Sequence, residues 1–158
     1  MTFAPKRILV PVSFEPSDAA FAEDAVSWGC DLAQQLGASL QLLHVCPPLV
    51  AEPALRPGAY DAMVQCREAL LALARARLGE LEQLAEGRGV ACESQLLEAD
   101  GSVPELIVQA AAERQSDLVT LPTHGRRGVR RLLLGSVAER VAHLSPVPVL
   151  LFPEPRSS

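Results

Sequence analysis

Three glycines and a serine form the part of the sequence best suited to hold an anion: Gly125, Gly128, Gly135 and Ser136. Glycine adopts positive φ and lets the main chain come close to a ligand. Gly135 and Ser136 lie where a helix is expected to begin, and the unpaired amides of a helix start attract negative charge. Arginines between these glycines, Arg126 among them, can add charge-assisted hydrogen bonds. The stretch therefore favours binding of a negatively charged group.

A purely structural interpretation of the same stretch stays open. Residues 136–139 read Ser-Val-Ala-Glu, the spacing of a capping box, in which Ser136 only begins a helix. Gly125 and Gly128 also suit turns, and the arginine run suits a solvated surface. The residues by themselves do not decide between an anion site and a capped helix start.

The sequence lacks the usual groups of a catalytic site. The first crossover, residues 11–17, contains no glycine and is therefore not a dinucleotide-binding fingerprint, and no Gly-Lys-Ser/Thr phosphate loop occurs. His124 lies in the glycine loop without an activated nucleophile beside it. His44, on an apolar run, and His143, late on an expected helix, are interpreted as structural. We therefore expect no dedicated enzyme.

The elements that must position the glycine loop follow from apolar patterning. Five short segments are expected to be strands: Arg7–Val12, Ser39–Val45, Val90–Leu97, Asp117–Leu121 and Val147–Phe152. Four segments between them predict helices: one after Ser17, one marked by Leu70 to Ala85, one after Ser102, and one from Ser136 to Leu144.

This alternation predicts a doubly wound α/β fold, a five-stranded parallel sheet with helices on both faces. Ligands of such sheets bind outside the carboxyl ends of the strands. These ends are expected at Pro11 to Phe14, at Val45 to Cys46, and from Leu121 onward.

Local signals predict the ends and the buried faces of the helices. Ser17 is expected to cap the first helix and Gly37 to end it. Ser102 and Glu105 again have the capping-box spacing. The proline-rich residues 46–58 predict a long loop, either a flexible crossover or a lid. Apolar residues at three- and four-residue spacing predict that the first helix is amphipathic: Phe21, Ala25, Trp28, Leu32 and Leu36. The long second helix is marked by Leu70, Ala74, Leu78, Leu81 and Ala85, and the third contains Leu106, Val108, Ala111 and Ala112.

The composition limits the function further. The chain has 158 residues, 49% hydrophobic and 21% charged, which predicts a single globular domain over residues 1–153 with a loose tail at 154–158. A net charge of −5, and the absence of aromatic residues from the arginine run 126–131, disfavour nucleic-acid binding. No signal-peptide-like or membrane-spanning apolar stretch occurs, so a cytoplasmic protein is expected. The four cysteines, spaced 16, 20 and 26 residues apart, are expected to be free thiols because they lack a zinc-site pattern.

Gly125, nine intervening residues and then Gly135-Ser136 resemble the signature of the universal stress protein family. Similar motifs follow in order along the chain: Ile8–Val12, Leu43–Val45, Thr123–Gly125 and Pro146–Leu150. The resemblance implies a cytoplasmic stress-response regulator, usually a homodimer, on a Rossmann-like sheet of the adenine nucleotide alpha hydrolase type. One branch of this family binds ATP and another does not.

In the ATP-binding branch, the resemblance implies a site shared between strand ends and the glycine loop. The residues implied at the adenosine are Pro11, Val12, Ser13 and Val45, and those implied at the ribose and phosphates are Gly125, Gly135, Ser136 and Val137. Leu121, Pro122 and Arg126 complete the expected site, with Mg²⁺ as a companion of the ATP phosphates. Slow incidental ATP hydrolysis is compatible with such a site.

Two positions depart from the family pattern. Pro122 stands where the family has glycine, and proline has no N–H to offer a nucleotide. Ser13 stands where the opening strand typically ends in aspartate. The alternative function is therefore a dimeric protein-interaction module that binds no nucleotide. Val147–Phe152 is expected at a sheet edge, where Pro148 is tolerated, and two copies that pair there would cover the edge.

Overall fold

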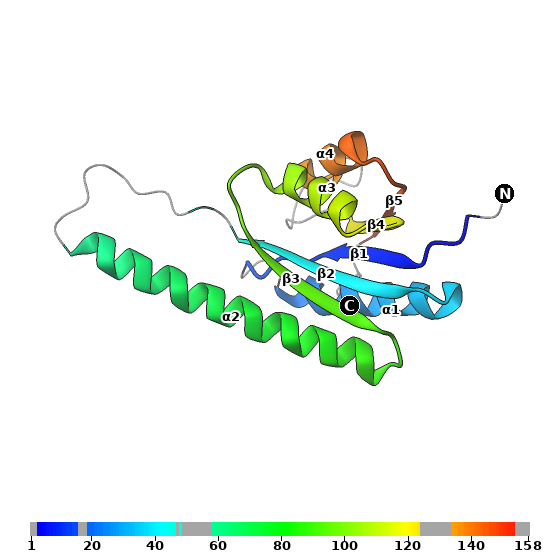
Figure 1. Ribbon diagram of the computed structural model, residues 1–158, viewed down its shortest axis with the longest axis horizontal. Helices are drawn as coiled ribbons and strands as arrows, with labels where there is room; N and C mark the ends of the chain where they lie inside the picture. The colour runs from blue at the N-terminus through cyan, green and yellow to red at the C-terminus, as the bar shows by residue number, and fades with distance from the viewer. Residues whose placement is uncertain (1–2, 16–18, 47, 49–57, 124–133, 154–158) are drawn as a thin grey trace.

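The computed structural model describes residues 3–15, 19–46, 48, 58–123 and 134–153 (Figure 1). Strands and helices alternate throughout these residues. In chain order they are β1 (Arg7–Pro11), α1 (Ala19–Leu36), β2 (Ser39–Cys46), α2 (Ala59–Gly87), β3 (Cys92–Glu98), α3 (Val103–Glu113), β4 (Leu118–Pro122), α4 (Ser136–Leu144) and β5 (Val149–Phe152). No helix within the described residues is both long and apolar enough to cross a membrane.

The five strands form one parallel sheet in the order β3-β2-β1-β4-β5. The chain builds outward from β1 to β2 and β3, then crosses to the other side of β1 for β4 and β5. The order of the strands therefore reverses between β1 and β4, which is the point where doubly wound proteins bind ligands. The predicted fold class is confirmed.

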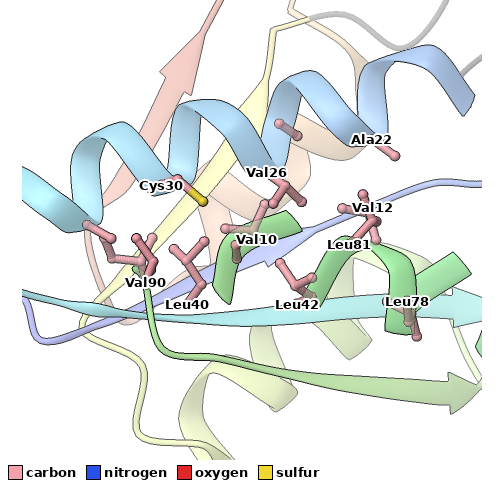
Figure 2. Packing of buried hydrophobic residues seen from close by; sticks show 14 of the residues in the cluster. Val10, Val12, Ala22, Val26, Cys30, Leu40, Leu42, Leu78, Leu81 and Val90 are labelled. Atoms are coloured by element: carbon pink, nitrogen blue, oxygen red, sulfur yellow. The ribbon is translucent and has the colours of Figure 1, made fainter. Parts of the chain in front are cut away.

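Two apolar layers hold the sheet between its helices. Helices α1 and α2 lie on one side of the sheet, and α3 and α4 on the other (Figure 1). In the first layer, Val10 and Leu42 meet Cys30 and Leu81 (Figure 2). Leu9 points to the opposite layer, and both Leu9 and Val10 are fully buried. Burial on both faces explains why the middle of β1, Ile8-Leu9-Val10, is an unbroken apolar run.

Helix α1 ends where the sequence predicts. Gly37 has a φ of +62°, the left-handed conformation that glycine adopts without strain, and the Ala38 amide donates to the Ala33 carbonyl at 2.9 Å. The predicted cap Ser17 lies outside the described residues. The prediction that Trp28 is buried is wrong, because 46% of this residue is exposed. Its ring lies at the margin of the layer and stacks on Phe152 of β5, with ring centroids 5.6 Å apart.

Helix α2 is longer than the apolar pattern indicates. It begins at Ala59, well before Leu70, and its first three turns contribute no buried residue. Leu70 belongs to the apolar pattern that marks this helix in the sequence, but it is 55% exposed and its neighbour Leu71 is buried instead. Both leucines fit a helical spacing to Ala74, so only the packing of the helix on the sheet distinguishes them.

The buried face of helix α3 includes only one of the four apolar residues that mark this helix in the sequence, Ala111. Ile107, Ala110 and Ala111 are buried, whereas Ala112 is exposed. Ser102 occupies the N-cap position as expected, but its side chain makes no capping hydrogen bond. The main chain starts this helix, through the Leu106 amide and the Ser102 carbonyl at 3.1 Å.

Candidate functional site

The ends of β1, β2 and β4 bring the predicted strand residues to one edge of the sheet. We call this the carboxyl edge and define it by Pro11, Cys46 and Pro122, where these strands end. Parallel pairing of β1 with both β2 and β4 makes the three ends neighbours. The topology thus gathers residues that lie more than a hundred positions apart in the sequence.

Burial divides the predicted strand residues into two groups. Val12, Val45 and Leu121 are less than a tenth exposed, and their side chains belong to the hydrophobic layers. Pro11, Ser13 and Pro122 are half-buried at the carboxyl edge. Side-chain contacts with a ligand are therefore open to the second group, and the buried residues shape the edge through their packing.

The start of α4 differs from the predicted capping box. Gly135, with φ −61° and ψ 145°, is the N-cap, and no side chain caps the helix. Ser136 is the first helical residue and is exposed, so the interpretation of Ser136 as a side-chain cap is wrong. The first intrahelical bond runs from the Glu139 amide to the Gly135 carbonyl at 2.8 Å.

Not every amide of this stretch is free to bind a ligand. The Gly135 amide donates to the Thr123 carbonyl at 2.8 Å, so it is already used within the protein. Within the described residues, no acceptor is recorded for the main-chain amides of Ser136 and Val137, which the geometry of a helix start leaves unpaired. The anion-binding capacity of the described stretch therefore lies with Ser136 and Val137. Gly125, Arg126 and Gly128 lie outside the described residues.

The end of β4 offers fewer donors than the family pattern provides. The amides of Val119 and Thr123 donate to β5, to the carbonyls of Pro148 and Phe152 at 3.0 and 2.9 Å. Successive residues of a strand direct their amides to opposite neighbours, so position 122 faces β1. A residue with an N–H would direct it there, toward the point where the strand order reverses, but Pro122 has none.

His44 joins the end of β1 to β2. Its ring Nδ1 lies 2.9 Å from the Val12 carbonyl, and the ring of Phe14 packs against it with centroids 4.5 Å apart. Burial lowers the pKa of His44, and the bond to the Val12 carbonyl partly offsets this effect. The sequence indicates only a structural role for His44. Its position directly before Val45, a candidate site residue, is the signal that links it to the site.

Ser13 lies between Val12 and Phe14 in the segment after β1. Its hydroxyl oxygen accepts a long hydrogen bond from the Glu15 amide at 3.4 Å, which leaves the hydroxyl hydrogen free to donate to a ligand. Ser13 is uncharged, so it supplies no carboxylate for a ribose or a metal ion.

The other polar groups of the described residues form no alternative centre. Among the residues with described positions, no three His, Cys, Asp or Glu side chains gather as metal ligands. All four cysteines are free thiols, as expected. Burial, as the largest cause, raises the pKa of Cys92 to about 12, so this thiol stays protonated at neutral pH.

The parallel strand order β3-β2-β1-β4-β5, with helices between the strands, defines a doubly wound α/β protein. The chain belongs to the universal stress protein family, whose family model matches residues 5–153. A curated relative, the universal stress protein MJ0531 of Methanocaldococcus jannaschii, is 30% identical over 153 residues, which cover 96% of this chain and 84% of the relative.

Solved structures agree with the fold. The universal stress protein UspA from Lactobacillus plantarum has a TM-score of 0.74 at 21% identity, covering 93% of this chain and 97% of that one. A universal stress protein in complex with cAMP has a TM-score of 0.66 at 22% identity, covering 96% of this chain and 99% of that one. At these identities the likeness shows a shared fold.

Proposed function

We propose that this protein binds an adenine nucleotide, preferably ATP with Mg²⁺, at the carboxyl edge between β1 and β4. It would act as a cytoplasmic stress-response regulator, with no dedicated catalytic role. The observation that carries the proposal is the start of α4, where exposed Ser136 and Val137 have main-chain amides without an acceptor in the described part of the chain. Such amides, at the positive end of a helix dipole, bind phosphate groups.

The proposed site divides into two sides. The adenosine side consists of Pro11, Val12, Ser13 and Val45, with Leu121 and Pro122 at the neighbouring end of β4. The phosphate side consists of Gly135, Ser136 and Val137. To these we add Gly125 from the family signature and Arg126 from the arginine run that follows it. Because the Gly135 amide is bonded to Thr123, we assign Gly135 a role in the close approach of the main chain to the ligand.

Family membership and the related cAMP complex support an adenine nucleotide as the ligand class. Phosphates bound at the α4 start would hold the Mg²⁺ ion, because Ser13 provides no carboxylate near β1. The absence of an amide at Pro122 removes one donor, so we expect weaker binding than in a protein with the full family pattern.

The proposal is tested by thermal unfolding of the purified protein with increasing ATP and Mg²⁺, after mass spectrometry has identified any nucleotide already bound. Ligand at a hundredfold its dissociation constant stabilises a protein by about 2.7 kcal/mol. GTP serves as the control for adenine recognition. We expect a saturable rise in Tm with ATP and a smaller one with GTP. Unchanged Tm with ATP, ADP, AMP and cyclic AMP would contradict the proposal.

A second candidate function, a dimeric interaction module, is favoured by the edge strand β5. Within the described residues, β5 pairs with β4 alone, and Leu150 on it is 37% exposed. Trp28 extends this apolar margin on the α1 side. We propose that two copies pair through Val147–Phe152, which would cover both edges about a two-fold axis. A homodimer is compatible with nucleotide binding, since β5 lies on the far side of β4 from β1.

A further inference from the structure

We infer that His44 is a positioning residue, which fixes the segment after β1 on the adenosine side of the proposed nucleotide site. The inference rests on the proposed function for its effect on affinity. Its structural part, the anchoring of Val12, Ser13 and Phe14, can be measured without a nucleotide.

His44 and its neighbour hold both polar main-chain groups of Val12. The Val12 amide donates to the Leu43 carbonyl at 2.8 Å, and the Val12 carbonyl lies 2.9 Å from His44 Nδ1. A carbonyl oxygen only accepts hydrogen bonds, so His44 Nδ1 must carry the proton and donate. Two consecutive β2 residues thus continue the attachment of β1 beyond its last strand residue, Pro11.

The ring of His44 makes a second contact with the same segment. Phe14 packs on it with centroids 4.5 Å apart and ring planes inclined by 36°. Val12 and Phe14 are therefore both attached to one side chain, and Ser13 lies between them. His44 therefore acts on Ser13 through the main chain on either side of it, since its ring contacts Val12 and Phe14.

The protonation state of the ring suits this role. Burial lowers the pKa of His44, so the ring is neutral at neutral pH and its single proton sits on Nδ1. A segment already held in its binding conformation loses less freedom when a ligand arrives, which favours affinity. Removing the hydrogen bond would then weaken binding without removing any group that touches the ligand.

Two variants separate the hydrogen bond from the ring contact. His44→Phe keeps an aromatic ring for Phe14 and removes the donor to Val12. His44→Asn removes the ring and places its side-chain amide nitrogen near the position of Nδ1. His143→Gln changes an exposed histidine on α4 and serves as the matched control.

Hydrogen exchange of the Val12–Glu15 amides in the nucleotide-free full chain measures the anchoring. Calorimetry with Mg-ATP measures its consequence. We expect His44→Phe to speed exchange in this segment and to weaken ATP binding about three- to tenfold. His44→Asn should restore part of the slow amide exchange and part of the ATP affinity. His143→Gln should match the wild type in both measurements. In the wild type, imidazole ¹⁵N shifts should show Nδ1 protonated and Nε2 unprotonated.

The two measurements distinguish failure of the proposed function from failure of the inference about His44. Wild-type protein that binds no ATP would contradict the proposed function, while exchange in the His44 variants would still decide the anchoring. Unchanged exchange at Val12–Glu15 in His44→Phe would overturn the inference. So would wild-type ATP affinity in that variant, or a ring protonated at Nε2 instead of Nδ1.

Discussion

Ser136 offers the proposed ligand two donors, a main-chain amide and a hydroxyl, at the first position of α4. Proline is well tolerated at this helix position, where the N–H has no intrahelical partner. The preceding residue, Gly135, already has the extended conformation that a following proline requires. A proline at position 136 therefore removes both donors and leaves the helix intact.

We expect Ser136→Pro to leave the unfolding midpoint of the nucleotide-free protein nearly unchanged. The variant should weaken ATP binding about tenfold or more, because hydrogen bonds to charged groups contribute about 1.5–3 kcal/mol. Ser136→Ala, which keeps the amide, is the control and should lose less affinity. Calorimetric titration with ATP measures these affinities. Equal ATP affinity of Ser136→Pro and the wild type would show that the Ser136 amide does not bind the nucleotide.

Pro122 provides a test in the opposite direction. Pro122→Ala adds an N–H that faces β1, where the family pattern has a glycine amide. We expect ATP affinity to rise about threefold to tenfold, the effect of one added hydrogen bond. The unfolding free energy should fall by about 0.5–1 kcal/mol, because alanine leaves the unfolded chain more freedom than proline. Titration and denaturant unfolding measure the two effects, and an affinity that does not rise would count against the proposed position of the ligand.

At the scale of elements, α2 shows what its apolar spacing leaves undetermined. Leu70 and Leu71 are neighbours that fit the helical apolar spacing equally well, but Leu70 is 55% exposed and Leu71 only 7%. Leu71→Ala should destabilise the protein by about 2–5 kcal/mol, because it removes most of a buried side chain. Leu70→Ala should change the unfolding free energy by about 0.5 kcal/mol or less. Urea unfolding of both variants measures the difference, and equal losses would contradict the packing of α2.

The strands were predictable because the residue pattern that marks each one lies within the strand itself. The strands β1, β2 and β4 are mostly buried between the two layers, and the predicted bounds of all five strands differ from the observed ones by at most two residues. The start of α2 was not predictable from the same pattern, since its first turns contribute no buried residue and hence no apolar stripe. Helix faces depend on packing against the sheet, which a single sequence does not specify.

The candidate site was predictable in outline and not in its hydrogen bonds. Alternating strands and helices placed Pro11, Val45 and Leu121 near strand ends, and pairing of the strands makes those ends neighbours. The hydrogen bond from the Gly135 amide to the Thr123 carbonyl is a tertiary contact, and no local spacing in the sequence predicts it. The bond from His44 to Val12 likewise joins two strands and has no sequence signature.

The proposed homodimer forms through the edge strand β5. It is tested by placing a charged side chain on that edge. Leu150→Lys should halve the solution mass at micromolar concentration, because like charges would meet across the two-fold axis. Leu73→Lys, on a 60% exposed leucine of α2, is the matched control and should keep the wild-type mass. Analytical sedimentation measures the solution mass of both variants. A wild type that is already monomeric at this concentration would contradict the dimer.

At the scale of the whole molecule, the strand order separates the two proposed surfaces. The nucleotide would lie at the reversal point between β1 and β4, and the partner copy along β5 beyond β4. Thr123, directly after β4, connects the two surfaces: its carbonyl accepts from the Gly135 amide, and its own amide donates to the Phe152 carbonyl of β5. The proposed regulator therefore has its ligand and its partner on adjoining parts of one sheet.

The central claim is that the start of α4 and the end of β1 bind one adenine nucleotide together. Titration of ¹⁵N-labelled protein with Mg-ATP, followed by amide chemical shifts, tests it most directly. The account predicts saturable shifts at Ser136 and Val137 and, with the same dissociation constant, at Val12 and Ser13. Saturable shifts confined to other parts of the chain, or no shifts at millimolar ATP, would contradict it.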